Sequence, residues 1–248
     1  MNTENDKIIA EQHKSFWAWW QSLSKEWQER LVQAIGLRAV SAEDLQNQDF
    51  MKQHWYAMEN ITHLDLSDTS VSDISALEKL TNLTHLVLSH TNIRDISILA
   101  QLPYLQELDL NNTQVVNLSA LTKLKQLTTL DLENTNVDSI AALAKLTNLK
   151  SLLLGYTGVR DFSVLVNLTK LTYLNLMETG IRDISVLANL TNLKELGLGW
   201  TAVSDISALA NLTNLTYLDL RFTDVEDISA LEHLPHLDQI DVEGTSME

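Results

Sequence analysis

A threonine that recurs every 22 residues constrains the fold of this chain more than any other feature. The surrounding pattern is L-x-x-L-x-L-x-x-T-x-V/I-x-D-I-S-x-L-x-x-L, which from Ile61 gives eight full repeats ending at His236 and a truncated ninth from Leu237 to Glu248. Such a period is typical of a solenoid, in which each repeat is stabilised mainly by its neighbours. The nine threonines are Thr69, Thr91, Thr113, Thr135, Thr157, Thr179, Thr201, Thr223 and Thr245.

Each repeat contains a short strand followed by a returning segment. Repeat positions four and six, such as Leu86 and Leu88, alternate with polar residues at a period of two, which predicts a strand with one buried face. Stacked repeats would then form a parallel sheet, and apolar residues at positions eleven, fourteen, seventeen and twenty complete the core. An aspartate followed by Ile or Phe and then Ser predicts turn and N-cap chemistry for a short convex helical turn. These aspartates are Asp73, Asp95, Asp161, Asp183, Asp205 and Asp227.

Residues 1–58 lack the repeat and are predicted to form an N-terminal α-helical cap on the repeat domain, 59–248. We expect Ser24 to be a helix N-cap, Gly36 to stop that helix, and Ser41 and Asp44 to form a capping box. The favoured interpretation is that the cap shields the leucines of the first repeat from water. In the alternative, Trp17 or Trp19 docks a partner. A helical three-four spacing relates Phe16, Trp20, Leu23, Trp27, Leu31 and Ile35.

The repeat resembles the leucine-rich-repeat family, especially the bacterial 22-residue type of internalins. The segment from Asp183 to Leu193, DISVLANLTNL, carries this resemblance, which covers residues 61–248. It implies a right-handed curved α/β solenoid with a parallel concave sheet, short helical or 3-10 convex segments and a protein bound on the concave face. The family usually has Asn where this chain has Thr, so a hydroxyl must serve in the buried ladder. Internalins also carry a signal sequence and anchoring regions that we do not find here, so the resemblance does not extend to host-cell invasion.

Composition narrows the partners and the compartment. The 17 basic and 33 acidic residues give a formal charge of −16, so phosphate backbones and anionic lipids should repel the chain. We expect a protein partner. The negative charge could serve to bind a basic surface of that partner, or it could serve only solubility. The sequence contains no cysteine and its first thirty residues contain no apolar signal core. A cytoplasmic protein is therefore expected, and export without a standard signal is the alternative.

The third and fourth repeats place Glu107, Asp109, Asp131 and Glu133 on the concave face. Neighbouring strands lie about 4.8 Å apart, so Asp109 and Asp131 should repel each other. This acidic patch could dock a Lys or Arg side chain or a divalent cation. The alternative is that aspartate at position five merely belongs to the common Leu-Asp-Leu pattern of the repeat.

His63 and His85 occupy position three of adjacent strands, and Asp65 lies two residues along the first of them. Two imidazoles and a carboxylate are compatible with a transition-metal site. The spacing is generic, and solvated histidines are the favoured interpretation, so we expect no metal and no other cofactor.

The fifth to eighth repeats carry large side chains outside the leucine core. An exposed aromatic patch with a charged rim is the composition of an interface hot spot. The alternative is aromatic stacking that only rigidifies the sheet. The patch consists of Tyr156, Trp200 and Phe222 at position eight, Tyr173 and Tyr217 at position three, and Leu153 and Met177, bordered by Glu178, Glu195, Asp219 and Arg221.

No phosphate loop, nucleophile elbow or HExxH motif occurs in the sequence. The sequence therefore predicts a non-catalytic protein-recognition module that acts as an inhibitor, an adaptor or a scaffold. An exported effector or adhesin-like surface protein is the second hypothesis. A metal-dependent enzyme built on His63, His85 and Asp65 is the third.

Overall fold

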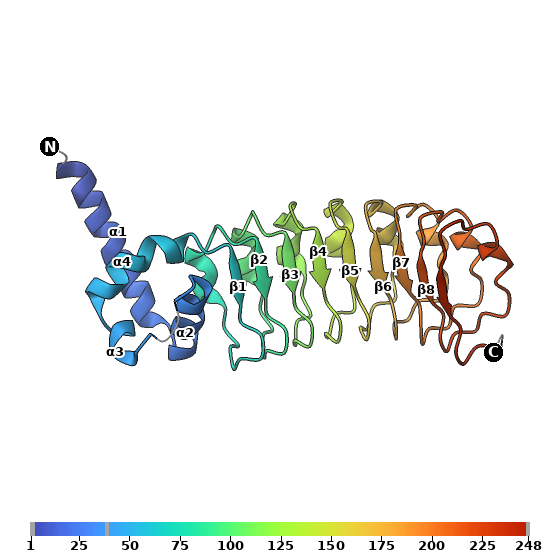
Figure 1. The fold of residues 1–248 in the computed structure, drawn as a ribbon, viewed down its shortest axis with the longest axis horizontal. Coiled ribbons are helices and arrows are strands. Elements are labelled where there is room, and N and C mark those ends of the chain that lie inside the picture. Colours follow the sequence, from blue (N-terminus) through green and yellow to red (C-terminus); the bar gives the residue numbers. More distant parts are fainter. Residues whose placement is uncertain (1–2, 38–39, 247–248) are drawn as a thin grey trace.

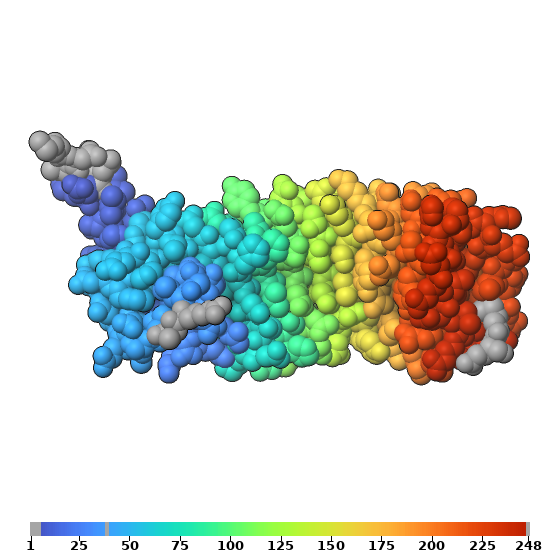
Figure 2. Space-filling model, viewed as in Figure 1, coloured from blue at the N-terminus to red at the C-terminus, as the bar shows by residue number. Residues whose placement is uncertain are grey.

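The computed structural model describes residues 3–37 and 40–246, and these form an elongated solenoid with a helical cap at its N-terminal end (Figure 1). In this part of the chain, nine strands pair in parallel and in sequence order, β1 to β9. Figure 2 shows the same rod with its cap packed against the first repeats. The strands are β1 His63–Asp65, β2 His85–Val87, β3 Glu107–Asp109, β4 Thr129–Asp131, β5 Ser151–Leu153, β6 Tyr173–Asn175, β7 Glu195–Gly197, β8 Tyr217–Asp219 and β9 Gln239–Asp241.

The register of the sheet follows the 22-residue period, because each strand residue pairs with its equivalent in the next repeat. Leu64 pairs with Leu86, and Leu86 with Leu108. Leucines at positions four and six are buried in the first eight repeats, so the predicted core and solenoid are confirmed. Short 3-10 helices form the opposite side: η1 Ser75–Lys79, η2 Ser97–Gln101, η3 Ser119–Lys123, η4 Ala141–Lys145, η5 Ser163–Asn167, η6 Ser185–Leu187, η7 Ser207–Leu209 and η8 Ser229–Leu231.

The hydroxyl of the recurring threonine donates a hydrogen bond within its own repeat. Thr91 Oγ1 donates to the carbonyl of Leu88 at 2.6 Å, and Thr201 repeats this contact with Leu198. The hydroxyl thus satisfies a buried backbone acceptor three residues upstream, at the point where the chain leaves the strand. The expected use of a hydroxyl is confirmed, and the bond stays inside the repeat.

Each convex 3-10 helix begins one residue later than predicted, so the aspartate precedes the N-cap residue. The N-cap residue of η1 is Ile74, which has no side-chain cap, and Asp73 Oδ1 accepts from the N–H of Ser75 at 2.8 Å. The same bond joins Asp183 to Ser185, where it lowers the pKa of the carboxyl. The turn chemistry is therefore confirmed, whereas the N-cap assignment is wrong, because the aspartate reaches over an apolar N-cap residue that the core requires.

The cap consists of α1 Thr3–Ser22, α2 Lys25–Ala34, α3 Ala42–Leu45 and α4 Gln48–Glu59, the last ending one residue beyond the predicted boundary. Ser24 caps α2 by accepting from the N–H of Trp27, and Gly36 follows α2 with φ +81°. Ser41 and Asp44 form the expected capping box. The predicted helical stripe is therefore shared by two helices that meet at Ser24. None of the described helices combines the length and the apolar character that a membrane span requires.

The cap contacts the first repeat directly. Trp19 is buried, and its Nε1 donates to the carbonyl of Ala76 at 3.2 Å. Glu26 accepts from the Ser70 hydroxyl at 2.6 Å. Trp17 is partly buried against the core. Leu64 of the first repeat is buried. The hypothesis that Trp19 docks a partner is wrong, because its indole already packs against the first repeat.

Candidate functional site

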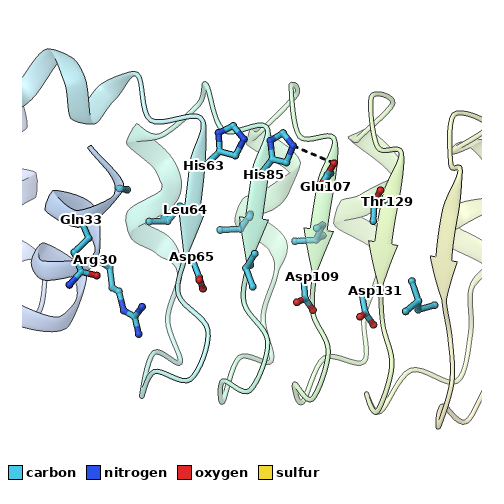
Figure 3. A pocket seen from close by; sticks show the side chains of 15 residues that line it. Arg30, Gln33, His63, Leu64, Asp65, His85, Glu107, Asp109, Thr129 and Asp131 are labelled. Carbon is cyan, nitrogen blue, oxygen red and sulfur yellow. Dashed lines mark ion pairs between the residues drawn. The ribbon is translucent and has the colours of Figure 1, made fainter. Parts of the chain in front are cut away.

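Side chains at positions three, five and seven of each repeat lie on the outer face of the sheet, opposite the buried leucines. They line two hollows. The N-terminal groove, of about 690 Å³, runs from α2 to β5, and the C-terminal slot, of about 150 Å³, lies over β6–β8. The groove is lined by Arg30, Gln33, Ala34, His63, Asp65, His85, Val87, Glu107, Asp109, Thr129, Asp131 and Leu153 (Figure 3). The slot is lined by Tyr173, Asn175, Met177, Glu195, Gly197, Tyr217, Asp219 and Arg221.

The structure brings three of the four predicted acidic residues together. Asp109 and Asp131 are partners in the β3–β4 register, and Asp131 accepts from the N–H of Glu133 at 2.8 Å. Burial, together with the charges of Asp109 and Glu133, raises the pKa of Asp131 to about 6. Glu107 lies apart from them, beside His85 at the other end of the strand (Figure 3). The cluster is therefore Asp109, Asp131 and Glu133.

The histidine pair does not form the metal site considered above. The rings of His63 and His85 stack with centroids 4.0 Å apart, and His85 Nε2 lies 3.3 Å from a Glu107 carboxylate oxygen. Asp65 lies farther along its strand (Figure 3) and accepts from both the N–H and the hydroxyl of Ser67. The three side chains do not converge. Among the described residues, no three His, Cys, Asp or Glu side chains are placed to hold a metal ion.

Position eight of the repeat has a left-handed backbone, with φ between +51° and +58° in eight repeats. Asn and Asp tolerate this conformation, whereas bulky side chains rarely adopt it. Tyr156, Trp200 and Phe222 nevertheless occupy it, with 53%, 49% and 39% of their surfaces exposed. Trp200 and Phe222 stack, with ring centroids 4.0 Å apart. Phe222 also covers the space that a side chain at Gly244 would fill.

The predicted aromatic patch therefore has two parts, because position eight falls in the turn after the strand. Tyr156, Trp200 and Phe222 form a row along this turn, which we call the edge row. Tyr173 and Tyr217 lie inside the C-terminal slot. Met177 joins the two parts, since its sulfur lies 3.5 Å from the Tyr156 hydroxyl. The sequence predicted all five aromatics on one concave surface, with the three position-eight residues along one edge of it.

An ion pair and a hydrogen bond hold side chains of the C-terminal slot in place. Arg221 donates from Nε and Nη2 to the Asp219 carboxylate at 2.9 and 2.8 Å, and Asp219 is only 2% exposed. The Tyr217 hydroxyl donates to Asp241 at 2.7 Å. Burial and this hydrogen bond raise the pKa of Tyr217 to about 12. Glu178 and Glu195 remain exposed.

Sequence reasoning missed Arg30 and Gln33 of α2, which form the end wall of the N-terminal groove (Figure 3). Arg30 reaches the carbonyl of Ser67 at 3.2 Å. Helical periodicity identifies the buried stripe of α2 but not what its polar face meets. Asn175 was also missed; its amide donates to Glu133 from two strands away, a contact that no local pattern indicates.

Known families and structures match this architecture. A model described as leucine-rich repeats in two copies matches residues 59–101, 81–123 and 103–145, and a single leucine-rich-repeat model matches 211–231. No curated protein sequence matches the chain. A leucine-rich-repeat protein of Leptospira interrogans is 20% identical, covers 76% of this chain and 56% of its own, and has a TM-score of 0.63, which supports the fold alone.

Two internalins of Listeria monocytogenes are more similar. Internalin C2 is 30% identical, with 88% of this chain and 92% of that chain covered and a TM-score of 0.78. The internalin InlF is 28% identical, with 89% and 76% covered and a TM-score of 0.73. Together with the nine strands stacked at the 22-residue period, this similarity shows that the chain belongs to the bacterial internalin-like leucine-rich-repeat family.

Proposed function

We propose that this chain is a non-catalytic recognition module that holds a partner protein on its concave face and along the edge row. The leucine-rich-repeat fold is typical of protein–protein interaction modules. The observation that carries the proposal is the edge row, where large aromatic side chains occupy left-handed positions and remain exposed.

The edge row costs stability without filling the core. A left-handed conformation costs about 1–2 kcal/mol for most L-residues. Trp200 and Phe222 offset part of this cost by stacking, which contributes about 0.5–1.5 kcal/mol. The row thus adds little net stability, whereas tryptophan and tyrosine dominate interface hot spots. Stacking that only rigidifies the sheet is therefore the weaker explanation.

The acidic cluster supports a partner with a basic surface. Burial raises the pKa of both Asp131 and Glu133, Asp109 lies beside them, and the whole chain carries a formal charge of −16. A field of one sign accelerates association with a partner of opposite charge and is screened by salt. The edge row would then supply affinity, and the N-terminal groove would supply orientation and speed.

Trp200→Ala tests the proposal. Immobilised wild-type protein should retain a specific protein from an extract of the native organism, and moderate salt should weaken the retention. Trp200→Ala should bind the same protein at least about tenfold more weakly, since truncating a hot-spot residue costs about 2 kcal/mol or more. Its melting temperature should stay close to that of the wild type.

Tyr104→Ala is the matched control, because Tyr104 is also an exposed aromatic, at 57%, but lies in the loop before β3. It should bind like the wild type. Equal retention by wild type and Trp200→Ala would contradict the role of the edge row. A large loss of stability with intact binding would show that Trp200 is packed structure.

We propose a cytoplasmic inhibitor, adaptor or scaffold as the role, on the acidic charge of the chain. The similarity to internalins supports the second candidate, an exported effector or adhesin-like protein. Fractionation of the native organism separates the two. Protein found in the medium or on the cell surface would favour the second.

A further inference from the structure

The C-terminal slot has two aromatic walls and an acidic mouth. The register aligns Tyr173, Glu195 and Tyr217 at position three of β6, β7 and β8. All three line one hollow of about 150 Å³, the size of a cavity that accommodates one benzene molecule. Two strand spacings separate the tyrosines, about 9.6 Å at the backbone. The hollow that the two tyrosines and Glu195 line therefore has room for one small flat group.

The floor of the slot presents oxygen atoms. Gly197 is the position-five residue of β7 and lines the slot, so no side chain fills the space at this point of the strand. The Asn175 side-chain oxygen would lie 2.6 Å from a Cβ at Gly197. This oxygen accepts from the N–H of Met177, and the neighbouring Asp219 carboxylate accepts from Arg221. The floor is therefore polar and its acceptors are held in place.

The electrostatic field of the slot is negative. Arg221 and Asp219 pair with each other and largely cancel, which leaves Glu195 at the mouth and Asp241 behind Tyr217. Burial raises the pKa of Tyr173, and the charges of Glu133, Glu195 and Asp131 raise it further. Both phenols therefore lie in a field that disfavours a further negative charge and favours a cation.

We infer that this slot receives the guanidinium group of an arginine side chain of the partner, between the rings of Tyr173 and Tyr217 and paired with Glu195. The flat guanidinium stacks on aromatic faces, and its planar set of N–H donors matches the Glu195 carboxylate. Lysine has a compact, strongly hydrated ammonium that matches a slit between rings less well. This inference rests on the proposed function and specifies one anchor of the partner.

Nα-acetyl-arginine amide is the probe, and Nα-acetyl-citrulline amide, which has the same shape without charge, is its control. We expect the arginine compound to shift the NMR ring resonances of Tyr173 and Tyr217 in a saturable manner, with a dissociation constant on the order of 10 mM. Citrulline should bind at least about fivefold more weakly, the factor that corresponds to 1 kcal/mol of cation–π attraction. Nα-acetyl-lysine amide should fall between them.

Variants locate the binding. Tyr173→Leu and Glu195→Gln should each weaken arginine binding at least about threefold, whereas Tyr217→Phe, which keeps the ring, and Tyr104→Leu, which lies elsewhere, should not. Equal binding of arginine and citrulline, tighter binding of lysine, or indifference to Tyr173→Leu would overturn the inference. None of these results would affect the proposed function, because that is tested by retention of a partner protein and its loss in Trp200→Ala.

Discussion

Repeats one to four and repeats five to eight share the same left-handed turn at position eight but fill it with different side chains. The first four carry Asp68, His90, Asn112 and Asn134, and the next four carry Tyr156, Glu178, Trp200 and Phe222. The φ angles are indistinguishable between the two groups, +51° to +56° and +52° to +58°. The stacked repeat therefore fixes the backbone of this turn whichever side chain is present. Asp and Asn, which favour this turn, occur in the first half, whereas the bulky aromatics of the second half rarely adopt it.

The two halves also treat their carboxylates differently. In the N-terminal groove, Asp131 faces Asp109 and Glu133, and its pKa is raised to about 6. In the C-terminal slot, the buried Asp219 accepts two hydrogen bonds from Arg221. The first half thus holds a half-buried carboxylate beside like charges, whereas the second half pairs its buried carboxylate with an arginine. Each difference can be tested by substitution.

The largest effect on stability should follow from breaking the internal pair. Arg221→Met leaves Asp219 buried without its cation, and removal of one partner of a buried pair costs several kcal/mol. Because about a third of the Arg221 side chain is exposed, we expect a smaller loss of about 2 kcal/mol in the free energy of unfolding. Urea denaturation at pH 7 measures it.

Arg221→Lys is the control for this change, since it keeps the positive charge but cannot form the bidentate hydrogen bonds to the carboxylate. It should lose about half as much stability as Arg221→Met. If both variants unfold like the wild type, the pair contributes nothing and the contrast between the two halves disappears.

A smaller effect, of opposite sign, is expected in the acidic cluster. The raised pKa of Asp131 means that the folded protein binds this proton more tightly than the unfolded chain, so the ionised group destabilises the fold above about pH 6. Asp131→Asn should therefore stabilise the protein at pH 7 by about 1 kcal/mol, with solvent screening allowed for. The gain should shrink as pH falls through 6 and vanish near pH 4.

The difference between variant and wild type is the quantity to measure, because the turn aspartates titrate in the opposite direction. Bonds from serine N–H groups lower the pKa of residues such as Asp95 and Asp205, so their stabilisation is lost in acid. Subtracting the two urea curves at each pH removes this shared background. A constant difference between pH 4 and pH 7 would mean that Asp131 does not titrate as described.

The repeat made most of the fold predictable from sequence, because the same assignment of strand and buried positions had to fit every 22-residue repeat. Strand positions, buried leucines and the capping residues Ser24, Gly36 and Ser41 follow from local chemistry and were predicted. The N-cap role predicted for the turn aspartates was wrong, because a shift of one residue in the helix start leaves the sequence motif unchanged.

The candidate site was predicted less completely, since it depends on where side chains point across strands. Periodicity places Asp109 beside Asp131, and the register confirms it. It does not reveal that His63 and His85 stack, that Glu107 turns towards His85, or that α2 brings Arg30 to the groove. Asp68, Asn112 and Asn134 are typical of the left-handed φ at position eight, but Tyr156, Trp200 and Phe222 are not, so the residue types of the edge row do not indicate this backbone.

The smallest effect isolates the cost of the left-handed turn itself. Glu178 has the same φ as Trp200, within 6°, and an exposed side chain that is not aromatic. Glu178→Asn should stabilise the protein by about 0.5 kcal/mol, because Asn tolerates this backbone better than Glu. Trp200→Asn gains the same relief but loses the stack on Phe222, so its free energy of unfolding should stay near that of the wild type. Urea denaturation of both variants at pH 7 separates the cost of the left-handed backbone from the gain of the aromatic stacking. A clear loss of stability in Trp200→Asn, with a gain in Glu178→Asn, would mean that stacking outweighs strain, and the edge row would then stabilise the fold on its own account.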